Sequence, residues 1–307
     1  MKGLDEARSL YETYGAPMIR ERFPACEGRI AVGLAGRGSA CFGFDDEVSR
    51  DHDFDSGFCL WLEDEDDLRI GVELARAYRA LPLSRGGARS AMAEDALGVR
   101  RTAFFYRRYT GSPGAPEHWR QWMALPSYAL AEATNGEVWR DDLGQFSAVR
   151  ETLLHGMPED VRRKKLAARA IEMAQSGQYN YSRCLRHGEE GAAMLAAAEF
   201  VRAACGLIYL LNRRHMPYYK WMLRGLEPLP ILGSLRPALD YLLTGDNDAA
   251  GQATKAGVIE DIRAAAVKEL HRQELSEGEW DYLEPHAFAI MGTIRDPEIR
   301  ALHVMEG

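Results

Sequence analysis

The sequence predicts an α+β fold, with a small mixed-sheet domain over residues 1–150 followed by an all-α helical bundle domain over residues 151–307. Two observations predict this division. In the first half, short apolar runs end at turns rich in Gly, Asn and Pro, a pattern typical of strands. From about residue 147 onward, apolar residues recur at spacings of three and four, a pattern typical of helices. With 46% apolar residues, a chain of 307 can bury a core in each of two ordinary domains.

The first half alternates expected helices and strands. Apolar residues at helical spacing predict a helix over 4–22, and the apolar run 29–35 predicts a buried strand that leads into a turn at 36–39. The remaining elements expected here are strands at 58–62, 99–106 and 137–139 and a helix over 66–80. The acidic run 63–67 is expected to be a solvated loop.

The second half is expected to contain helices throughout. Pro158 is expected near a helix start, because proline fits the first turn of a helix. The Ala-rich stretch 189–212 carries one apolar face, and the residues from Val258 to Leu270 indicate a further helix.

Composition limits the classes of function. The formal net charge of −8 argues against a general nucleic-acid or membrane surface, although a local basic pocket remains possible. The five cysteines include no Cys-x-x-Cys pair, so we expect reduced thiols rather than a zinc site. No apolar run is expected to reach the roughly 18 residues of a membrane span. No signal peptide is recognised, and we expect a cytoplasmic protein with no membrane partner.

The chemistry is concentrated between two predicted strands. The strand expected at 29–35 is followed by a turn that contains Gly38 and Ser39. Backbone N–H groups and the serine hydroxyl in such a turn can bind phosphate oxygens. Asp51 and Asp53 follow, and residues i and i+2 of a strand point to the same face. Both carboxylates can therefore bind one or two Mg²⁺ (or Mn²⁺) ions, which would activate an attacking hydroxyl and neutralise a leaving pyrophosphate.

Other interpretations of this stretch fit the residues less well. A dinucleotide-binding loop needs a third glycine three residues after Gly38, where Cys41 stands. A calcium loop beginning at Asp51 would need Gly and Glu where Ser56 and Leu62 stand. A serine-hydrolase elbow would need glycine two residues before and two residues after Ser39, where Arg37 and Cys41 stand. A tight turn followed by a solvated acidic loop remains open.

These residues carry a resemblance to a known group. The Gly-Ser turn followed by Asp-x-Asp resembles the signature of the polymerase-beta-like nucleotidyltransferase superfamily. The chain is more closely similar to the family called "domain of unknown function 4037". That similarity rests on GLAGRGS at 33–39, GFDDE at 43–47, SRDHD at 49–53, GQYNY at 177–181, LNR at 211–213 and PYYKW at 217–221. It implies a nucleotidyltransferase domain followed by a helical bundle, and it does not supply a substrate.

The superfamily resemblance also implies a third carboxylate on a later strand. Glu132, Asp141 and Asp142 are the nearby acidic residues, and Asp141 is favoured because it follows the strand expected at 137–139. A solvated turn is the alternative role for Asp141 and Asp142. Without a third carboxylate, either catalysis would be weak or the domain would only bind a nucleotide.

Two polar-aromatic clusters in the helical domain are candidates for the rest of the site. The resemblance favours nucleotide-binding roles for Asn180, Arg183, Asn212 and Lys220, with Arg37 assisting at the turn. Cations can neutralise a triphosphate and aromatic rings can stack on a base. The alternative is that these residues end helices and complete the core.

The leading hypothesis is therefore a metal-dependent nucleotidyltransferase that moves a nucleoside monophosphate from an NTP to a hydroxyl-type acceptor, releasing pyrophosphate. Asp51 and Asp53 would bind the metal, and Gly38 and Ser39 the phosphates. The acceptor is a small molecule, a protein or RNA, and DNA is not expected. The rival hypothesis is a nucleotide sensor or partner-binding protein on a catalytically decayed scaffold.

Overall fold

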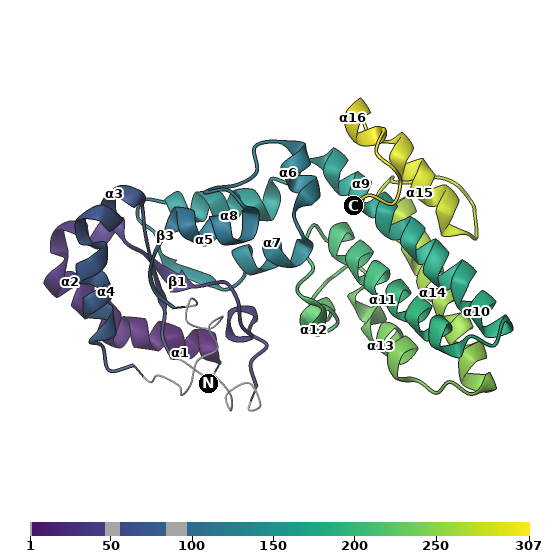
Figure 1. The fold of residues 1–307 in the computed structure, drawn as a ribbon, viewed down its shortest axis with the longest axis horizontal. Helices are drawn as coiled ribbons and strands as arrows, with labels where there is room; N and C mark the ends of the chain where they lie inside the picture. Colours follow the sequence, from purple (N-terminus) through teal and green to yellow (C-terminus); the bar gives the residue numbers. More distant parts are fainter. Residues whose placement is uncertain (1, 47–55, 84–96) are drawn as a thin grey trace. The chain divides into compact units, whose positions relative to one another are not determined.

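The computed structural model describes residues 2–46, 56–83 and 97–307 (Figure 1). The chain divides into two compact units. Unit 1 comprises Met1–Glu117 and Ala129–Gly156, and unit 2 comprises His118–Tyr128 and Met157–Gly307. Unit 1 holds a small mixed sheet and unit 2 is built of helices, which confirms the predicted α+β class.

The sheet of unit 1 has four strands in the order β3-β2-β1-β4. Their bounds are β1 Ala31–Leu34, β2 Cys59–Leu62, β3 Gly98–Arg101 and β4 Glu137–Arg140. β1 pairs antiparallel with both β2 and β4, whereas β2 and β3 are parallel. β1 is thus an inner strand, and the turn that follows it leaves the sheet between β2 and β4.

Helices cover both faces of the sheet. Successive side chains of β2 point to opposite faces, and each face packs against its own helices. Leu60 and Leu62 enter a core with Ile19 and Leu74, which lie on helices of one face. Trp61 packs on the opposite face, where its ring stacks on Phe146 with the centroids 3.9 Å apart. The helices of this unit are α1 Gly3–Leu10, α2 Ala16–Arg22, α3 Asp64–Asp66, α4 Val72–Arg79, α5 Thr102–Thr110, α7 Ser127–Thr134, whose first two residues belong to unit 2, and α8 Gln145–His155.

Two wider turns join helices of unit 1 into longer ones. A π-helical turn over Tyr11–Gly15 joins α1 to α2, so the helix predicted over 4–22 is confirmed as one continuous element. A second π-helical turn over Asp67–Gly71 joins α3 to α4.

Two local predictions for unit 1 were wrong. The acidic run 63–67 is not a solvated loop, because α3 begins within it and the buried Asp66 accepts a 2.6 Å hydrogen bond from Arg29 Nε. The strand expected over 99–106 ends at Arg101, and α5 follows directly. The apolar and aromatic run fits either conformation by pattern, and packing decides: Phe105 and Tyr106 of α5 lie against Phe146.

Unit 2 is organised around α9, which contacts α6, α11 and α15. Its helices are α6 Trp119–Ala124, α9 Glu159–Met173, α10 Ser182–Arg186, α11 Glu190–Leu211, α12 Tyr219–Met222, α13 Arg236–Thr244, α14 Ala249–Arg272, α15 Leu283–Gly292 and α16 Pro297–Arg300. A π-helical segment, Ala174–Tyr181, continues α9. Within it, Gly177 leaves room for Phe200, since a Cβ there would lie 2.3 Å from that ring.

Helix α11 is long and apolar enough to cross a membrane by length and composition, so the prediction that no run reaches this length was wrong. In its most apolar window, 67% of the residues are buried inside the structure. The helix packs on α9, α13 and the segment Ala174–Tyr181. Its apolar character is therefore that of a core helix of unit 2.

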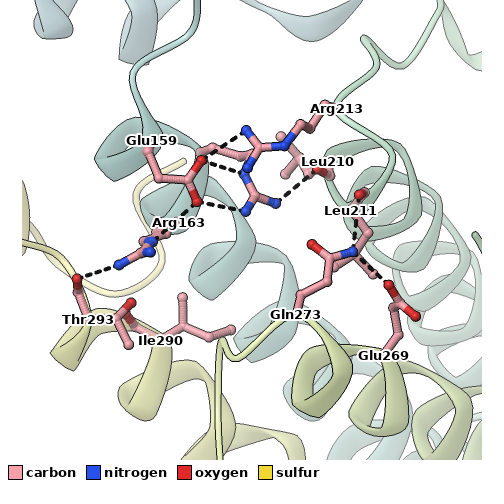
Figure 2. A network of polar contacts seen from close by, with 10 residues as sticks. Glu159, Arg163, Leu210, Leu211, Arg213, Glu269, Gln273, Ile290 and Thr293 are labelled. Carbon is pink, nitrogen blue, oxygen red and sulfur yellow. Dashed lines mark hydrogen bonds and ion pairs between the residues drawn. The ribbon is translucent and has the colours of Figure 1, made fainter.

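A polar network ties the end of α11 to its neighbours (Figure 2). Glu159 forms ion pairs with Arg162 at 2.7 Å and with Arg213 at 2.9 Å. Burial raises the pKa of Glu159, but the two arginines outweigh burial and lower the pKa to about 2. Gln273 donates a 3.2 Å hydrogen bond to the carbonyl of Leu211. The last turn of α11 is thus anchored from two directions.

Candidate functional site

The turn after β1 adopts a conformation that favours glycine. Gly36 has φ +116° and Gly38 has φ +113°, both in the region that other residues rarely enter. A Cβ on Gly36 would also lie 2.9 Å from the hydroxyl oxygen of Tyr109, whereas a Cβ on Gly38 would meet nothing within 4 Å. Gly36 is therefore required for space and conformation, and Gly38 for conformation alone.

A side chain that is distant in sequence, that of Asn135, holds this turn by hydrogen bonds. Asn135 Oδ1 accepts a 2.8 Å hydrogen bond from Gly36 N–H, and Asn135 Nδ2 donates a 2.7 Å bond to the Gly36 carbonyl. Arg150 in turn donates to the carbonyls of Asn135 and Gly136. A Cβ on Gly136 would lie 1.9 Å from the carbonyl oxygen of Leu34, so the turn between α7 and β4 approaches the end of β1 closely.

Ser39 ends the turn and begins a short 3₁₀ helix, Ala40–Phe42. Its carbonyl accepts hydrogen bonds from Phe42 N–H at 3.2 Å and Phe44 N–H at 2.9 Å. Gly38 is exposed and Ser39 is half-buried. The turn therefore presents both residues at the surface on a backbone that is fixed at each end.

Glu132 of α7 lies beside the turn. Its Oε2 is 3.4 Å from Arg37 Nε, and its side chain is only 14% exposed. Burial raises the pKa of Glu132, while the charges of Arg37 and Arg108 oppose that rise. Burial raises the pKa of the neighbouring Tyr109 too, and the Glu132 charge adds to the rise. A partly desolvated carboxylate and a phenol thus lie beside Arg37 and Gly36 of the turn, and the charge of Arg108 is near the carboxylate.

Asp141 has a different environment from Glu132. Its Oδ1 accepts a 3.1 Å hydrogen bond from Gly144 N–H, and its Oδ2 accepts a 2.7 Å bond from Ser147 N–H in the first turn of α8. A carboxylate at a helix N-terminus accepts hydrogen bonds from N–H groups that have no partner within the helix, and its negative charge interacts favourably with the helix dipole. Asp142 lies 2.6 Å from Arg140 on the surface. The contacts of Asp141 are those of a helix cap.

The predicted metal-binding residues Asp51 and Asp53 lie outside the described residues. Over 2–46, 56–83 and 97–307, the structure contains no group of three or more His, Cys, Asp or Glu residues that could hold a metal ion.

The predicted residues of unit 2 fall into two groups. Asn180 is half-buried at the end of the π-helical segment, and the exposed Arg183 on α10 lies over the Tyr179 ring at 5.5 Å. Asn212 and Lys220 belong to a single loop after α11. The amide of Asn212 bonds to the backbone of Ile231, and Lys220 lies 5.0 Å from the Trp221 ring centroid.

The structure brings two residues to the turn that the sequence did not connect with it, Asn135 and Glu132. Asn135 has no sequence signal for this role, because nothing local connects it to Gly36, 99 positions away. Glu132 was considered but ranked below Asp141. Glu132 lies on a helix, so no strand pattern pointed to it. Asn135 follows three residues later, a spacing that puts the two residues on the same side of the helix end.

Comparison with known families supports one part of the predicted resemblance. Residues 122–222 match the family described as Domain of unknown function (DUF4037), which confirms the predicted similarity to that family over this segment. The matched segment includes Glu132, Asn135, Asn212 and Lys220, whereas the Gly-Ser turn precedes it. Comparisons with curated proteins and with solved structures found no match.

Proposed function

We propose that this protein is a metal-dependent nucleotidyltransferase that moves a nucleoside monophosphate from an NTP to a hydroxyl-type acceptor and releases pyrophosphate. The observation that carries the proposal is the clamped Gly-Ser turn with the partly buried carboxylate of Glu132 beside it. A fixed, exposed backbone turn suits phosphate oxygens, and a desolvated carboxylate suits a cation.

Each residue at the turn has a role in this proposal. Gly38 and Ser39 hold the β- and γ-phosphate oxygens through backbone N–H groups and the serine hydroxyl, and Arg37 neutralises part of their charge. Asp51 and Asp53 bind Mg²⁺ or Mn²⁺ from the segment between the turn and β2. When bound, the metal lowers the pKa of the attacking hydroxyl and stabilises charge on the leaving pyrophosphate.

We assign the third carboxylate to Glu132 rather than Asp141. The oxygens of Asp141 already accept two backbone hydrogen bonds, so using Asp141 as a metal ligand would uncap α8. Glu132 is held within a few ångströms of Arg37, next to Gly38 and Ser39. Burial disfavours its charged form, and a nearby divalent cation would restore that form.

The second candidate function is nucleotide binding without turnover. It is favoured by the ion pair between Glu132 and Arg37, because a carboxylate engaged by arginine is less available to a metal. In both cases we place the protein in the cytoplasm, away from membranes. The acceptor, whether a small molecule, a protein or RNA, is left open.

Titration of the full chain with each of the four NTPs, with and without Mg²⁺, tests the proposal by calorimetry, and pyrophosphate release tests turnover. We expect metal-dependent binding of at least one NTP. The exchanges Asp51→Asn with Asp53→Asn, and Glu132→Gln, should each reduce turnover by at least about a hundredfold, since each removes charge stabilisation at the transition state.

Asp141→Asn is the matched control, since it also neutralises one acidic residue of unit 1 and should leave turnover within a few-fold of the parent. NTP binding that does not depend on the metal, or no binding of any NTP, would contradict the proposal. Metal-dependent binding without pyrophosphate release for any acceptor class would favour the binding-only alternative.

A further inference from the structure

The loop between α11 and the 3₁₀ turn Gly233–Leu235 differs in charge from the rest of the chain. From Asn212 to Leu226 it contains Arg213, Arg214, Lys220 and Arg224 and no Asp or Glu, in a chain whose formal net charge is −8. The same stretch contains Tyr218, Tyr219 and Trp221. Glu227, the next acidic residue, forms an ion pair with Arg236. Cations and aromatic rings are therefore concentrated together in this loop.

The neck of the loop is closed by one side chain. Asn212 Nδ2 donates a 2.8 Å hydrogen bond to the Ile231 carbonyl, and Asn212 Oδ1 accepts a 3.0 Å bond from Ile231 N–H. Arg213, in the unusual conformation φ +53°, is held by Glu159. We call residues 213–230 the 213–230 loop, and these contacts fix both of its ends.

The body of the loop is held against buried groups of unit 2. The hydroxyl of Tyr209 on α11 donates a 3.0 Å hydrogen bond to the carbonyl of Met222. The N–H of Met216 donates a 2.6 Å bond to Ser127 Oγ, which brings Tyr128 beside the loop. The backbone that carries the rings is therefore ordered before any ligand binds, which reduces the entropy lost on binding.

The tyrosine rings form a continuous exposed surface. Tyr128 and Tyr218 meet edge to face with centroids 5.9 Å apart, and Tyr218 and Tyr219 are 4.4 Å apart. Tyr128 is 43%, Tyr218 43% and Tyr219 67% exposed. Tyr219 begins α12 (Figure 1), Tyr218 directly precedes that helix, and Tyr128 belongs to α7.

Two cations follow Tyr219 in the same loop. Lys220 Nζ lies 5.0 Å from the Trp221 ring centroid and Arg224 Cζ lies 5.9 Å from it, so the indole orients both charges. Two of the exposed rings and both charges therefore lie within seven consecutive residues, 218–224.

We propose that Tyr128, Tyr218, Tyr219, Lys220 and Arg224 form a binding surface for a single-stranded polynucleotide. Bases stack on the tyrosine rings, and the cations contact the backbone phosphates. This combination of stacking platforms and cations is what single-strand binding requires. The proposal concerns unit 2 alone and does not depend on nucleotidyl transfer at the Gly-Ser turn.

The geometry disfavours other ligands. A small molecule needs a pocket that buries most of its surface, whereas these rings are about half exposed. A duplex keeps its bases stacked on one another, so it would use the cations and leave the rings unused. A single strand uses both.

Fluorescence anisotropy with labelled adenylate strands of about 12 nucleotides, one of RNA and one of DNA, tests the proposal. The full chain is used in EDTA without NTP, so the result is separable from the metal-dependent site. We expect Tyr219→Ala to weaken binding by about fivefold or more, the equivalent of about 1 kcal/mol for one lost stacking contact. Lys220→Gln and Arg224→Gln should each flatten the salt dependence by roughly 0.7 in log–log slope.

Two exchanges in unit 2 serve as matched controls. Phe288→Ala removes an exposed ring from α15, and Arg202→Gln removes an exposed positive charge from α11. Both should leave affinity unchanged. Circular dichroism melts check that Tyr219→Ala, an exchange at an exposed position, remains folded.

Three results would overturn the proposal. One is an affinity for both strands weaker than about 10⁻⁴ M at low salt. Another is duplex RNA binding as tightly as the single strand, with no effect of Tyr219→Ala. The third is an acidic peptide that binds as tightly as the strand and is weakened by the same tyrosine exchange, because that would assign the surface to a protein partner.

Discussion

The side-chain amide of Asn135 pairs with the backbone of Gly36 through two hydrogen bonds, of 2.8 Å and 2.7 Å, across 99 positions of sequence. The amide takes both the N–H and the carbonyl of one peptide residue, as a neighbouring strand would. This contact extends the pairing of β1 with β4 beyond Leu34 and holds the turn that presents Gly38 and Ser39. The candidate site therefore depends on a residue that need not touch a ligand.

Replacing Asn135 by Ala should destabilise unit 1. The exchange leaves the buried Gly36 N–H and carbonyl without their partners, which costs about 1–3 kcal/mol. Urea unfolding checks this free energy. Asn135→Asp keeps the acceptor for Gly36 N–H but loses the donor, so its loss should be intermediate. An Asn135→Ala protein as stable as the parent would contradict the clamp.

Gly38→Ala should cost stability through backbone strain alone. The residue sits at φ +113° with nothing within 4 Å of a new Cβ, so no clash contributes. Strain of this kind costs about 1–3 kcal/mol. Gly114→Ala is the control, because that position is equally open but lies outside the strained φ range. Thermal melts of the two variants should therefore differ, and equal melting temperatures would argue against the conformation of the turn.

Asp141→Ala should remove a helix cap without affecting nucleotide binding. The loss of the bonds to Gly144 and Ser147 should lower the free energy of unfolding by about 0.5–2 kcal/mol. Asp142→Ala, which removes only a surface ion pair with Arg140, should cost less than about 1 kcal/mol. Chemical unfolding measures both changes, and a calorimetric titration with MgATP checks the second expectation. Loss of metal-dependent binding in Asp141→Ala alone would return the catalytic role to Asp141.

A buried histidine, His286, predicts that the stability of unit 2 depends on pH. His286 Nδ1 lies 2.8 Å from Ser276 Oγ and His286 Nε2 lies 3.0 Å from the Trp280 carbonyl, an arrangement that suits the neutral ring. Burial lowers the pKa of His286, and the nearby His271 and Arg263 lower it further, while the Trp280 carbonyl and Glu279 raise it. The side chain joins α15 to the segment between α14 and α15.

Stability should therefore fall as pH drops below the ordinary histidine value of about 6.5. The folded pKa lies below the unfolded one, so the unfolded chain binds the proton first and unfolding becomes easier as acid is added. Melting temperatures between about pH 7 and pH 5 measure the effect. His286→Gln should be less stable than the parent at pH 7, but its melting temperature should fall less than that of the parent between pH 7 and pH 5.

The exposed His155 provides the comparison for this pH dependence, since its side chain is 65% exposed. His155→Gln should keep the parental decline between pH 7 and pH 5. If His286→Gln declines as steeply as the parent, the acid sensitivity comes from other groups.

Much of the fold follows from local patterns in the sequence. The short apolar runs 29–35 and 58–62 predicted two strands, and both are buried along their whole length as β1 and β2. Helical spacing predicted α11 and α14, although α14 begins earlier than the segment from Val258. The prediction failed at Thr102–Thr110, where an aromatic-rich run is compatible with either strand or helix until its packing partners are known.

The sequence by itself determined the glycines of the turn, the strands that enclose it and the helical character of unit 2. These properties reside in single residues and short periods, and they need no distant partner. Only the tertiary structure decided that Asn135 holds Gly36, that Glu132 rather than Asp141 lies beside Arg37, and that Asn212 closes the neck of the 213–230 loop. Each of these contacts depends on strand order or on helix packing, which join residues that local propensity cannot connect.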